Sequence, residues 1–291
     1  MADKNPSWRK LGLFAGGGAL PTRIARACRA REWPIYILHI TQDTDEALAD
    51  YPGEKVRIGA VGAALEALRR EGCDAVMLAG IVRRPNFQTL LPDLKGAAML
   101  PRVLAAATQG DDALLSCLVG LLEEEGFAVI GADEVLDDLI AGDGPLNSYR
   151  PSADDMKDIA KGADVVRALG RLDVGQGAIV CREYVLAVEA AEGTDAMLAR
   201  CAQLPREIRG APDARRGVLF KAPKPGQERR VDLPVMGVRT IELAAQSGLA
   251  GVAVEAGGAI IIDGDAVLQA ADAHGLFVYG APRKDDAGHS K

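Results

Sequence analysis

The stretch KLGLFAGGGALPTRIARACRARE, residues 10–32, indicates the fold of the first half of this chain. An apolar run ends in three glycines at 16–18, which is typical of a buried strand that leads into a tight turn. Ile24, Ala27 and Cys28 then recur at helical spacing and share one face. The stretch therefore predicts a strand, a glycine turn and a helix in that order.

The same alternation continues beyond this stretch. Further strands are expected at 34–40, 74–80 and 127–131, and helices at 62–72, 97–107 and 111–126, the last capped by Asp111 or Asp112. Continuous apolar strands that alternate with helices predict a parallel sheet covered on both faces. We therefore expect an α/β, Rossmann-like domain over residues 1–143.

The second half is less regular. A segment rich in Gly, Pro, Asn and Ser, AGDGPLNSYRPS at 141–152, suggests a linker between two domains. Beyond it, 177–193 predicts an antiparallel hairpin, and 194–204 predicts a helix with Thr194 or Asp195 at its start. We expect a second, catalytic α/β domain with antiparallel strand pairs over residues 144–291.

Composition narrows the class of protein. The 291 residues carry a net charge of −7, which argues against a nucleic-acid binder with a basic face. The five cysteines form no C-x-x-C pair, which favours reduced thiols, and with three histidines a zinc site is not expected. A metal would then be held by carboxylates, which points to Mg²⁺ or Mn²⁺.

The sequence also bears on location. It contains no run of 18 apolar residues, and its first ten residues, MADKNPSWRK, lack an apolar core segment. We therefore expect a cytoplasmic protein with no transmembrane segment.

The glycine turn is the first candidate site. Backbone N–H groups of Gly17 or Gly18, before a helix, could approach an anion, or the turn could serve packing alone. The dinucleotide pattern G-x-G-x-x-G is not met, because Pro21 stands at the third glycine position. Arg83, in GIVRRPNF after the third strand, is a second candidate for phosphate contact or is simply exposed.

Carboxylates cluster at the end of the predicted hairpin. Glu189, Glu192 and Asp195 lie within seven residues, with Thr194 between them, and they repel one another unless a cation or basic group lies nearby. Alternation along the strand directs Glu189 out of the core side. Gln176 precedes the hairpin's first strand and is a candidate for ligand contact. Helix capping by Thr194 and Asp195 is the structural alternative.

The stretch KAPKPGQERRVDLPVMG, residues 221–237, mixes basic and acidic residues with three prolines. Lys221 and Arg230 could neutralise phosphate charge, and Asp232 could take part in a Mg²⁺ site completed by phosphate oxygens and water. These residue types suit phosphoryl transfer or pyrophosphate hydrolysis. An ordered basic loop paired to local carboxylates is the alternative.

Together, AGGGALP, LDVGQGAIV, LAVEAAEGTDAML and KAPKPGQERRVDLPVMG resemble the LpxI family of UDP-2,3-diacylglucosamine pyrophosphatases, over residues 9 to 280 in matching order. The resemblance implies a Mg²⁺-dependent hydrolase of lipid A biosynthesis. It would release UMP and 2,3-diacylglucosamine 1-phosphate (lipid X), with the lipid product held between two domains. Peripheral contact with the inner membrane follows from such a substrate.

The resemblance also assigns residues. The family's essential aspartate falls on Asp232, as a metal ligand or a water-positioning base. Candidate partners are Glu189 for catalysis and Glu192 and Asp195 for the metal, while Lys221 and Arg230 are candidate clamps. One departure is Glu228, where an aspartate commonly follows the glutamine of this loop.

Two other classes of function stay open from the sequence. One is a nicotinamide-dependent oxidoreductase, suggested by the glycine turn, although no acidic ribose partner ends the second strand. The other is a non-enzymatic nucleotide- or lipid-binding regulator, which would leave the carboxylate cluster unexplained.

Overall fold

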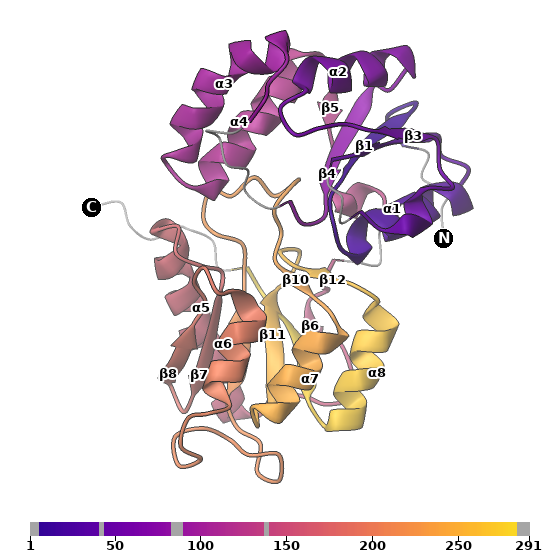
Figure 1. Cartoon of the computed structure of the whole chain (residues 1–291). Coiled ribbons are helices and arrows are strands. Elements are labelled where there is room, and N and C mark those ends of the chain that lie inside the picture. The colour runs from indigo at the N-terminus through magenta and orange to yellow at the C-terminus, as the bar shows by residue number, and fades with distance from the viewer. Residues whose placement is uncertain (1–5, 41–43, 83–89, 137–139, 284–291) are drawn as a thin grey trace. The chain divides into compact units, whose positions relative to one another are not determined.

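The fold is described from a computed structural model of the whole chain, over residues 6–40, 44–82, 90–136 and 140–283 (Figure 1). The chain divides into two compact units. The first contains residues 1–137 together with 228–232, and the second contains 138–227 and 233–291. The boundary expected at 143/144 stays a prediction. Nothing in the sequence led us to expect residues 228–232 in the first unit.

The first unit is built on a five-stranded parallel sheet in the order β3-β2-β1-β4-β5. The strands are β1 (Leu11–Ala15), β2 (Ile35–His39), β3 (Gly53–Lys55), β4 (Ala75–Ala79) and β5 (Ala128–Val129). The parallel sheet confirms the expected class of fold. The three-residue strand β3 was not expected, because it has no apolar pattern.

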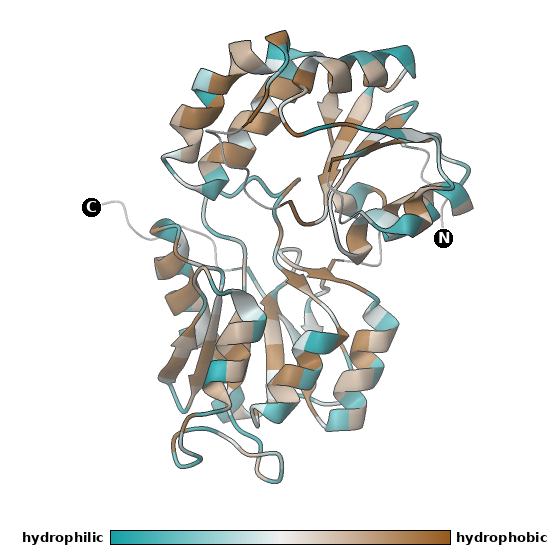
Figure 2. Ribbon diagram, in the orientation of Figure 1, coloured by the Kyte–Doolittle hydropathy of each residue, from teal (hydrophilic) through white to brown (hydrophobic). Residues whose placement is uncertain are grey.

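Four helices accompany this sheet, namely α1 (Ala19–Ala30), α2 (Val61–Arg70), α3 (Leu94–Ala107) and α4 (Asp111–Glu124), with short 3-10 turns at Glu46–Leu48 and Ala132–Glu134. Leu65 and Leu68 of α2 and Val119 of α4 form one core cluster with Leu38 and Val76 of the sheet. Figure 2 shows the result, with apolar strands and helices that are polar on one side.

The second unit is built on a six-stranded mixed sheet in the order β6-β13-β11-β9-β7-β8. Its strands are β6 (Gly144–Pro145), β7 (Gly177–Cys181), β8 (Tyr184–Val188), β9 (Val218–Lys221), β11 (Gly251–Glu255) and β13 (Phe277–Ala281). The pairs β9–β11 and β11–β13 are parallel, whereas β7–β8, β7–β9 and β6–β13 are antiparallel. The expected antiparallel pairs are therefore present.

Helices cover both faces of the second sheet. Helix α5 (Ala153–Arg171) packs on the face that carries Phe220, and α6 (Gly193–Cys201), α7 (Val238–Gln246) and α8 (Gly264–His274) pack on the face that carries Leu219. Neighbouring strand residues point to opposite faces, so this one strand contributes to both cores. A separate parallel pair, β10 (Val235–Met236) and β12 (Ile260–Ile261), lies outside the main sheet.

The hairpin between β7 and β8 turns through two residues in the left-handed region, Arg182 (φ 54°) and Glu183 (φ 61°). Neither is glycine, so the turn is strained unless something holds it. The buried carboxylate of Asp158 on α5 accepts both backbone N–H groups, at 3.0 and 2.6 Å. These two hydrogen bonds hold the turn of the hairpin whose second strand leads to Glu189.

Candidate active site

The glycine turn after β1 packs against the end of β4. Gly16 N–H donates to the Ala79 carbonyl at 2.8 Å, and Gly17 and Ile81 exchange two hydrogen bonds at 2.9 and 2.8 Å. A Cβ on Gly16 would lie 2.7 Å from the Ile81 oxygen, so this close approach requires glycine. The Gly17 N–H is thus used within the protein, while Gly18 is exposed. Ligand contact by either glycine stays a prediction, and Arg83 lies outside the described residues.

A buried polar cluster lies at the carboxyl end of β9. Lys221, the last residue of that strand, pairs in register with Gly177 of β7, and Glu189 continues the ladder by donating its N–H to the Gly177 carbonyl at 2.8 Å. Lys221 is 3% exposed and Glu189 is 7% exposed. These three residues therefore form a row across adjacent strands on one face of the sheet.

Thr194, in the first turn of α6, links the two charges. The Lys221 ammonium donates to Thr194 Oγ1 at 2.7 Å and to the Val235 carbonyl at 3.2 Å. The Thr194 hydroxyl in turn donates to Glu189 Oε1 at 2.9 Å. Helix α6 begins at Gly193 with Glu192 as its N-cap residue, so the expectation that Thr194 caps the helix is wrong. Its hydroxyl instead forms hydrogen bonds with the two buried charged groups of Lys221 and Glu189.

Gly177 makes room for this arrangement. A Cβ at Gly177 would lie 2.4 Å from Glu189 Oε2 and 3.4 Å from the Met197 Cε of α6. Within the described residues, Glu189 Oε2 is buried and has no hydrogen-bond partner. A carboxylate left half-satisfied in this way is costly and needs a nearby positive charge.

Burial lowers the pKa of Lys221, while the charges of Glu189 and Asp195 act in the opposite direction. The net direction is downward, because removing the ammonium from water disfavours its charged form. Chemically, the cluster can keep the Thr194 hydroxyl and the Val235 carbonyl at fixed positions.

The two carboxylates predicted as further metal ligands each contact an arginine. Glu192 pairs with Arg200 at 2.7 Å, and Asp195 pairs with Arg239 at 2.6 Å. The described residues contain no group of three His, Cys, Asp or Glu side chains that could hold a metal ion. A ligand role for Glu192 or Asp195 stays a prediction, and it would require each to release its arginine.

Residues 228–232, which include Asp232, belong to the first unit. The Arg230 guanidinium donates two hydrogen bonds to the Glu228 carboxylate, at 2.8 and 2.7 Å, and a third to Glu123 Oε1 of α4 at 2.7 Å. Val231 packs against the core cluster of the first sheet. Asp232 is half-buried, and its N–H donates to the Glu228 carbonyl at 3.1 Å. Arg230, predicted to clamp substrate, is thus already held by two carboxylates.

Sequence reasoning missed Glu123. The available signal was the run of three glutamates at 123–125, which end a helix where the helix dipole disfavours negative charge. Gln176 is half-buried, and its Oε1 is buried without a hydrogen-bond partner among the described residues. Its predicted contact with a ligand stays a prediction.

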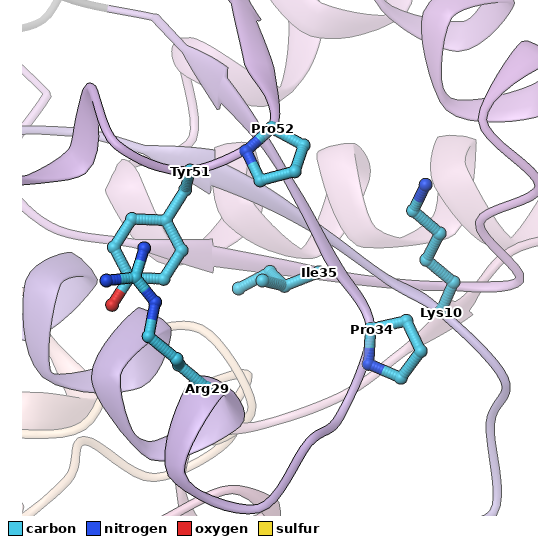
Figure 3. A pocket seen from close by; sticks show the side chains of 6 residues that line it. All are labelled: Lys10, Arg29, Pro34, Ile35, Tyr51 and Pro52. Carbon is cyan, nitrogen blue, oxygen red and sulfur yellow. The ribbon is translucent and has the colours of Figure 1, made fainter.

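A shallow pocket on the first unit lies elsewhere. It is lined by Lys10, Arg29, Pro34, Ile35, Tyr51 and Pro52 (Figure 3). The Arg29 guanidinium stacks over the Tyr51 ring, 3.7 Å from its centroid, which accounts for the positions of both side chains. None of the predicted site residues lines this pocket.

The fold and these polar groups define an α/β protein of two units, with a buried lysine–threonine–glutamate cluster on one and an aspartate segment fixed by an arginine on the other. Family models match this chain over residues 10–279. Residues 10–146 match the model of the LpxI N-terminal domain, and residues 142–279 match that of the LpxI C-terminal domain. The chain therefore belongs to the LpxI family.

A curated relative supports the same conclusion. UDP-2,3-diacylglucosamine pyrophosphatase LpxI of Caulobacter vibrioides is 52% identical over 272 residues, which cover 94% of this chain and 97% of the relative. Among solved structures, CobK precorrin-6A reductase aligns over 96% of this chain and 90% of its own, with a TM-score of 0.33 and 15% identity. That likeness is too distant to support any conclusion.

Proposed function

We propose that this chain hydrolyses the pyrophosphate of UDP-2,3-diacylglucosamine to UMP and 2,3-diacylglucosamine 1-phosphate, a step of lipid A biosynthesis. The observation that carries the proposal is the 52% identity, over 94% of the chain, to a relative named for this activity. The glycine turn, which suggested a nicotinamide cofactor, uses the Gly17 N–H for packing against Ile81. This favours the hydrolase over the oxidoreductase alternative.

We assign to Asp232 the role of the base that acts on the attacking water. Its carboxylate would orient the water and accept one proton as the water oxygen bonds to phosphorus and the bridging P–O bond breaks. The electron pair of that bond leaves with the departing phosphate. Attack at either phosphorus gives the same two products, so water labelled with ¹⁸O distinguishes them by the product that carries the label.

We propose Mg²⁺, or Mn²⁺ in its place, as the cofactor. Magnesium in phosphate-handling sites binds one or two carboxylates and takes its other ligands from substrate oxygens and water. As the alternative to its role as the base, Asp232 could supply one such carboxylate, and the arginine-paired Glu192 and Asp195 are weaker candidates. When bound, the ion would offset charge on the phosphate oxygens and lower the pKa of bound water.

The buried cluster of the second unit supports a positioning role. The Lys221 ammonium and the Glu189 carboxylate are enclosed, and only Thr194 joins them by hydrogen bonds among the described side chains. We therefore propose that Lys221 and Glu189 fix the Thr194 hydroxyl for contact with the substrate.

The diacyl substrate suggests where the enzyme acts. None of the helices in the described ranges is long and apolar enough to cross a membrane. We propose that the protein works on the cytoplasmic side of the inner membrane through peripheral contact, with the acyl chains held in an apolar groove. Mass spectrometry of lipid that co-purifies tests this, and a diacylated glucosamine phosphate is the expected finding.

Replacing Asp232 tests the function. Asp232→Ala should lower Mg²⁺-dependent release of UMP by about 10²- to 10⁴-fold, the usual contribution of a positioned acid–base group. Tryptophan fluorescence should show an unchanged fold, since Trp8 and Trp33 both lie in the first unit. Activity near that of the unaltered enzyme would exclude the assigned role, and activity that persists in EDTA would exclude the metal.

A further inference from the structure

Three consecutive glutamates stand at the end of helix α4, and each forms an ion pair with a different basic residue or residues. Glu124 binds Arg102 of α3 at 2.7 Å, and Glu125 binds Arg69 of α2 at 2.7 Å and Lys95 of α3. Glu123 binds Arg230 at 2.7 Å. Negative charge at the C-terminal end of a helix is locally unfavourable, so the run is explained by these tertiary pairs. Two of them hold helices together, and the third reaches a segment more than a hundred residues away.

Arg230 fixes that distant segment at several points. Its guanidinium makes a two-pronged contact with Glu228, a third hydrogen bond to Glu123 and a longer one to the Val129 carbonyl of β5, at 3.3 Å. A planar fork that binds two carboxylates has little freedom to rotate. Glu123 is the member of this group that belongs to a regular helix, and it therefore supplies the rigid anchor.

The anchored segment is short and carries Asp232. Residues 228–232 belong to the first unit, although 227 and 233 on either side belong to the second. Two side chains of this segment contact the rest of the first unit. Arg230 reaches Glu123 and the Val129 carbonyl, and Val231 packs on the core cluster.

We propose that Glu123 is a positioning residue for the reaction: through Arg230 it fixes residues 228–232, and so the Asp232 carboxylate, on the first unit. Glu123 itself touches neither substrate nor metal in this scheme. The proposal rests on the proposed function for the catalytic role of Asp232. The anchoring of the segment by Glu123 is a separate statement that can be measured without any substrate.

The chain contains a matched control. Glu123→Lys places a positive charge against Arg230, and Glu124→Lys places the same charge, one residue further along the same helix, against Arg102. The two glutamates are similarly exposed, at 47% and 56% of their side chains. We expect Glu123→Lys to lower kcat by about 10- to 100-fold, because a displacement near 1 Å can cost ~10²-fold. Glu124→Lys should stay within about twofold of the unaltered enzyme, as ordinary surface changes do.

Further measurements separate positioning from general damage. Glu123→Lys should leave KM within about twofold while kcat falls, and it should raise the Mg²⁺ concentration needed for half-maximal rate. Hydrogen exchange of the backbone amides at 228–232 should quicken in Glu123→Lys and stay unchanged in Glu124→Lys. In an Arg230→Gln background, Glu123→Gln should have no further effect, because its partner is already gone. Glu123→Gln alone replaces the lysine variant if the latter does not fold.

Equal kcat and equal exchange at 228–232 in the two lysine variants would overturn the proposal. If the unaltered enzyme releases no UMP, the proposed function fails by itself, and the exchange result still decides whether Glu123 anchors the segment.

Discussion

The central residue of the second unit is Lys221, a cation that is 3% exposed. An enclosed ammonium is tolerated only with close oxygen partners, and here it has the Thr194 hydroxyl and the Val235 carbonyl. Glu189 supplies the opposite charge through Thr194 rather than by direct contact. Each buried charge therefore depends on the other.

Lys221→Met should expose that dependence. Methionine fills a similar volume but leaves the Glu189 carboxylate buried without a cation, so we expect a loss of about 3–5 kcal/mol in the free energy of unfolding. Adding Glu189→Gln should restore part of this loss by removing the uncompensated charge. Urea unfolding followed by circular dichroism is the suitable measurement, because both tryptophans of the chain lie in the first unit.

The control for this pair lies on α5. Lys157 forms an exposed ion pair with Asp154, and Lys157→Met should change the free energy of unfolding by no more than about 0.5 kcal/mol. Additive losses from Lys221→Met and Glu189→Gln would show that the two charges are not coupled.

At the scale of single residues, the sequence indicated which polar residues lie in a site better than it indicated which residues they contact. Alternation along β8 directed Glu189 out of the core side, which is wrong, because its side chain is buried. The structure brings it together with Thr194 and Lys221. Glu192 and Asp195 looked equivalent in the sequence, yet each contacts an arginine, Arg200 or Arg239. Asp195 and Arg239 are 44 residues apart, and no local pattern relates them.

At the scale of elements, Asp93 serves two helices at once. Its Oδ1 accepts the Gly96 N–H of α3 at 2.7 Å, and its Oδ2 accepts the Ala63 N–H of α2 at 3.1 Å. Burial acts to raise the pKa of Asp93, but the N–H bonds from Gly96, Ala63 and their neighbours outweigh it and lower the pKa overall. One carboxylate thus joins the N-terminal ends of two helices.

Removing this cap should weaken the first unit in a pH-dependent way. Asp93→Ala should lower the free energy of unfolding by about 1–2 kcal/mol at pH 7. Because the pKa is depressed in the folded state, the stabilisation from the charged form is full above the unfolded value of about 3.9 and is lost as the pH falls through the folded value. The gap between the unaltered protein and Asp93→Asn, which keeps a neutral cap, should therefore close towards low pH.

Urea unfolding at a series of pH values, followed by tryptophan fluorescence, measures this gap. A constant difference between the unaltered protein and Asp93→Asn from pH 7 to below pH 4 would contradict a role for the charge.

Elements with long periodic patterns were predicted well, and short ones were not. The spacing of Ile24 and Cys28 correctly indicated α1, whose bounds are Ala19–Ala30. Strand β12 has only two residues and pairs with β10 outside the main sheet, through a contact that its own short run does not indicate. The helix cap expected at Asp111 or Asp112 falls on Gly110 instead, and no side chain caps α4 in the described part of the chain. Short strands and caps depend on distant partners that a local pattern does not contain.

At the scale of the whole molecule, the first unit is built from two segments that are far apart in the sequence. The chain passes from one unit to the other at 137/138, at 227/228 and again at 232/233. The glycines and prolines of the sequence suggested one linker at 141–152, and the boundary expected at 143/144 stays a prediction. Nothing in the sequence indicated the second and third passages, because the PKPGQERRVDLP stretch resembles an ordinary loop and its anchor, Glu123, lies far upstream.

This division predicts that a chain ending at residue 137 is an incomplete first unit. It lacks Val231, which packs on the core cluster, and Arg230, which pairs with Glu123. Burial of a valine side chain contributes about 1.5 kcal/mol and an exposed ion pair up to about 1 kcal/mol, so the fragment should be less stable than the same unit in the full chain by about 2 kcal/mol. Tryptophan fluorescence during urea unfolding compares the two directly, because Trp8 and Trp33 are present in both.

The full-length Arg230→Gln, Val231→Ala double variant is the matching control, since it removes the same contacts while both units stay covalently joined. Its tryptophan transition should shift to lower urea by nearly as much as that of the fragment. A fragment that unfolds at the same urea concentration as the unaltered protein would mean that residues 228–232 add nothing to the first unit. Arg230 and Val231 would then not hold Asp232 on the first unit, and a substitution at Glu123 could not act on Asp232 through Arg230.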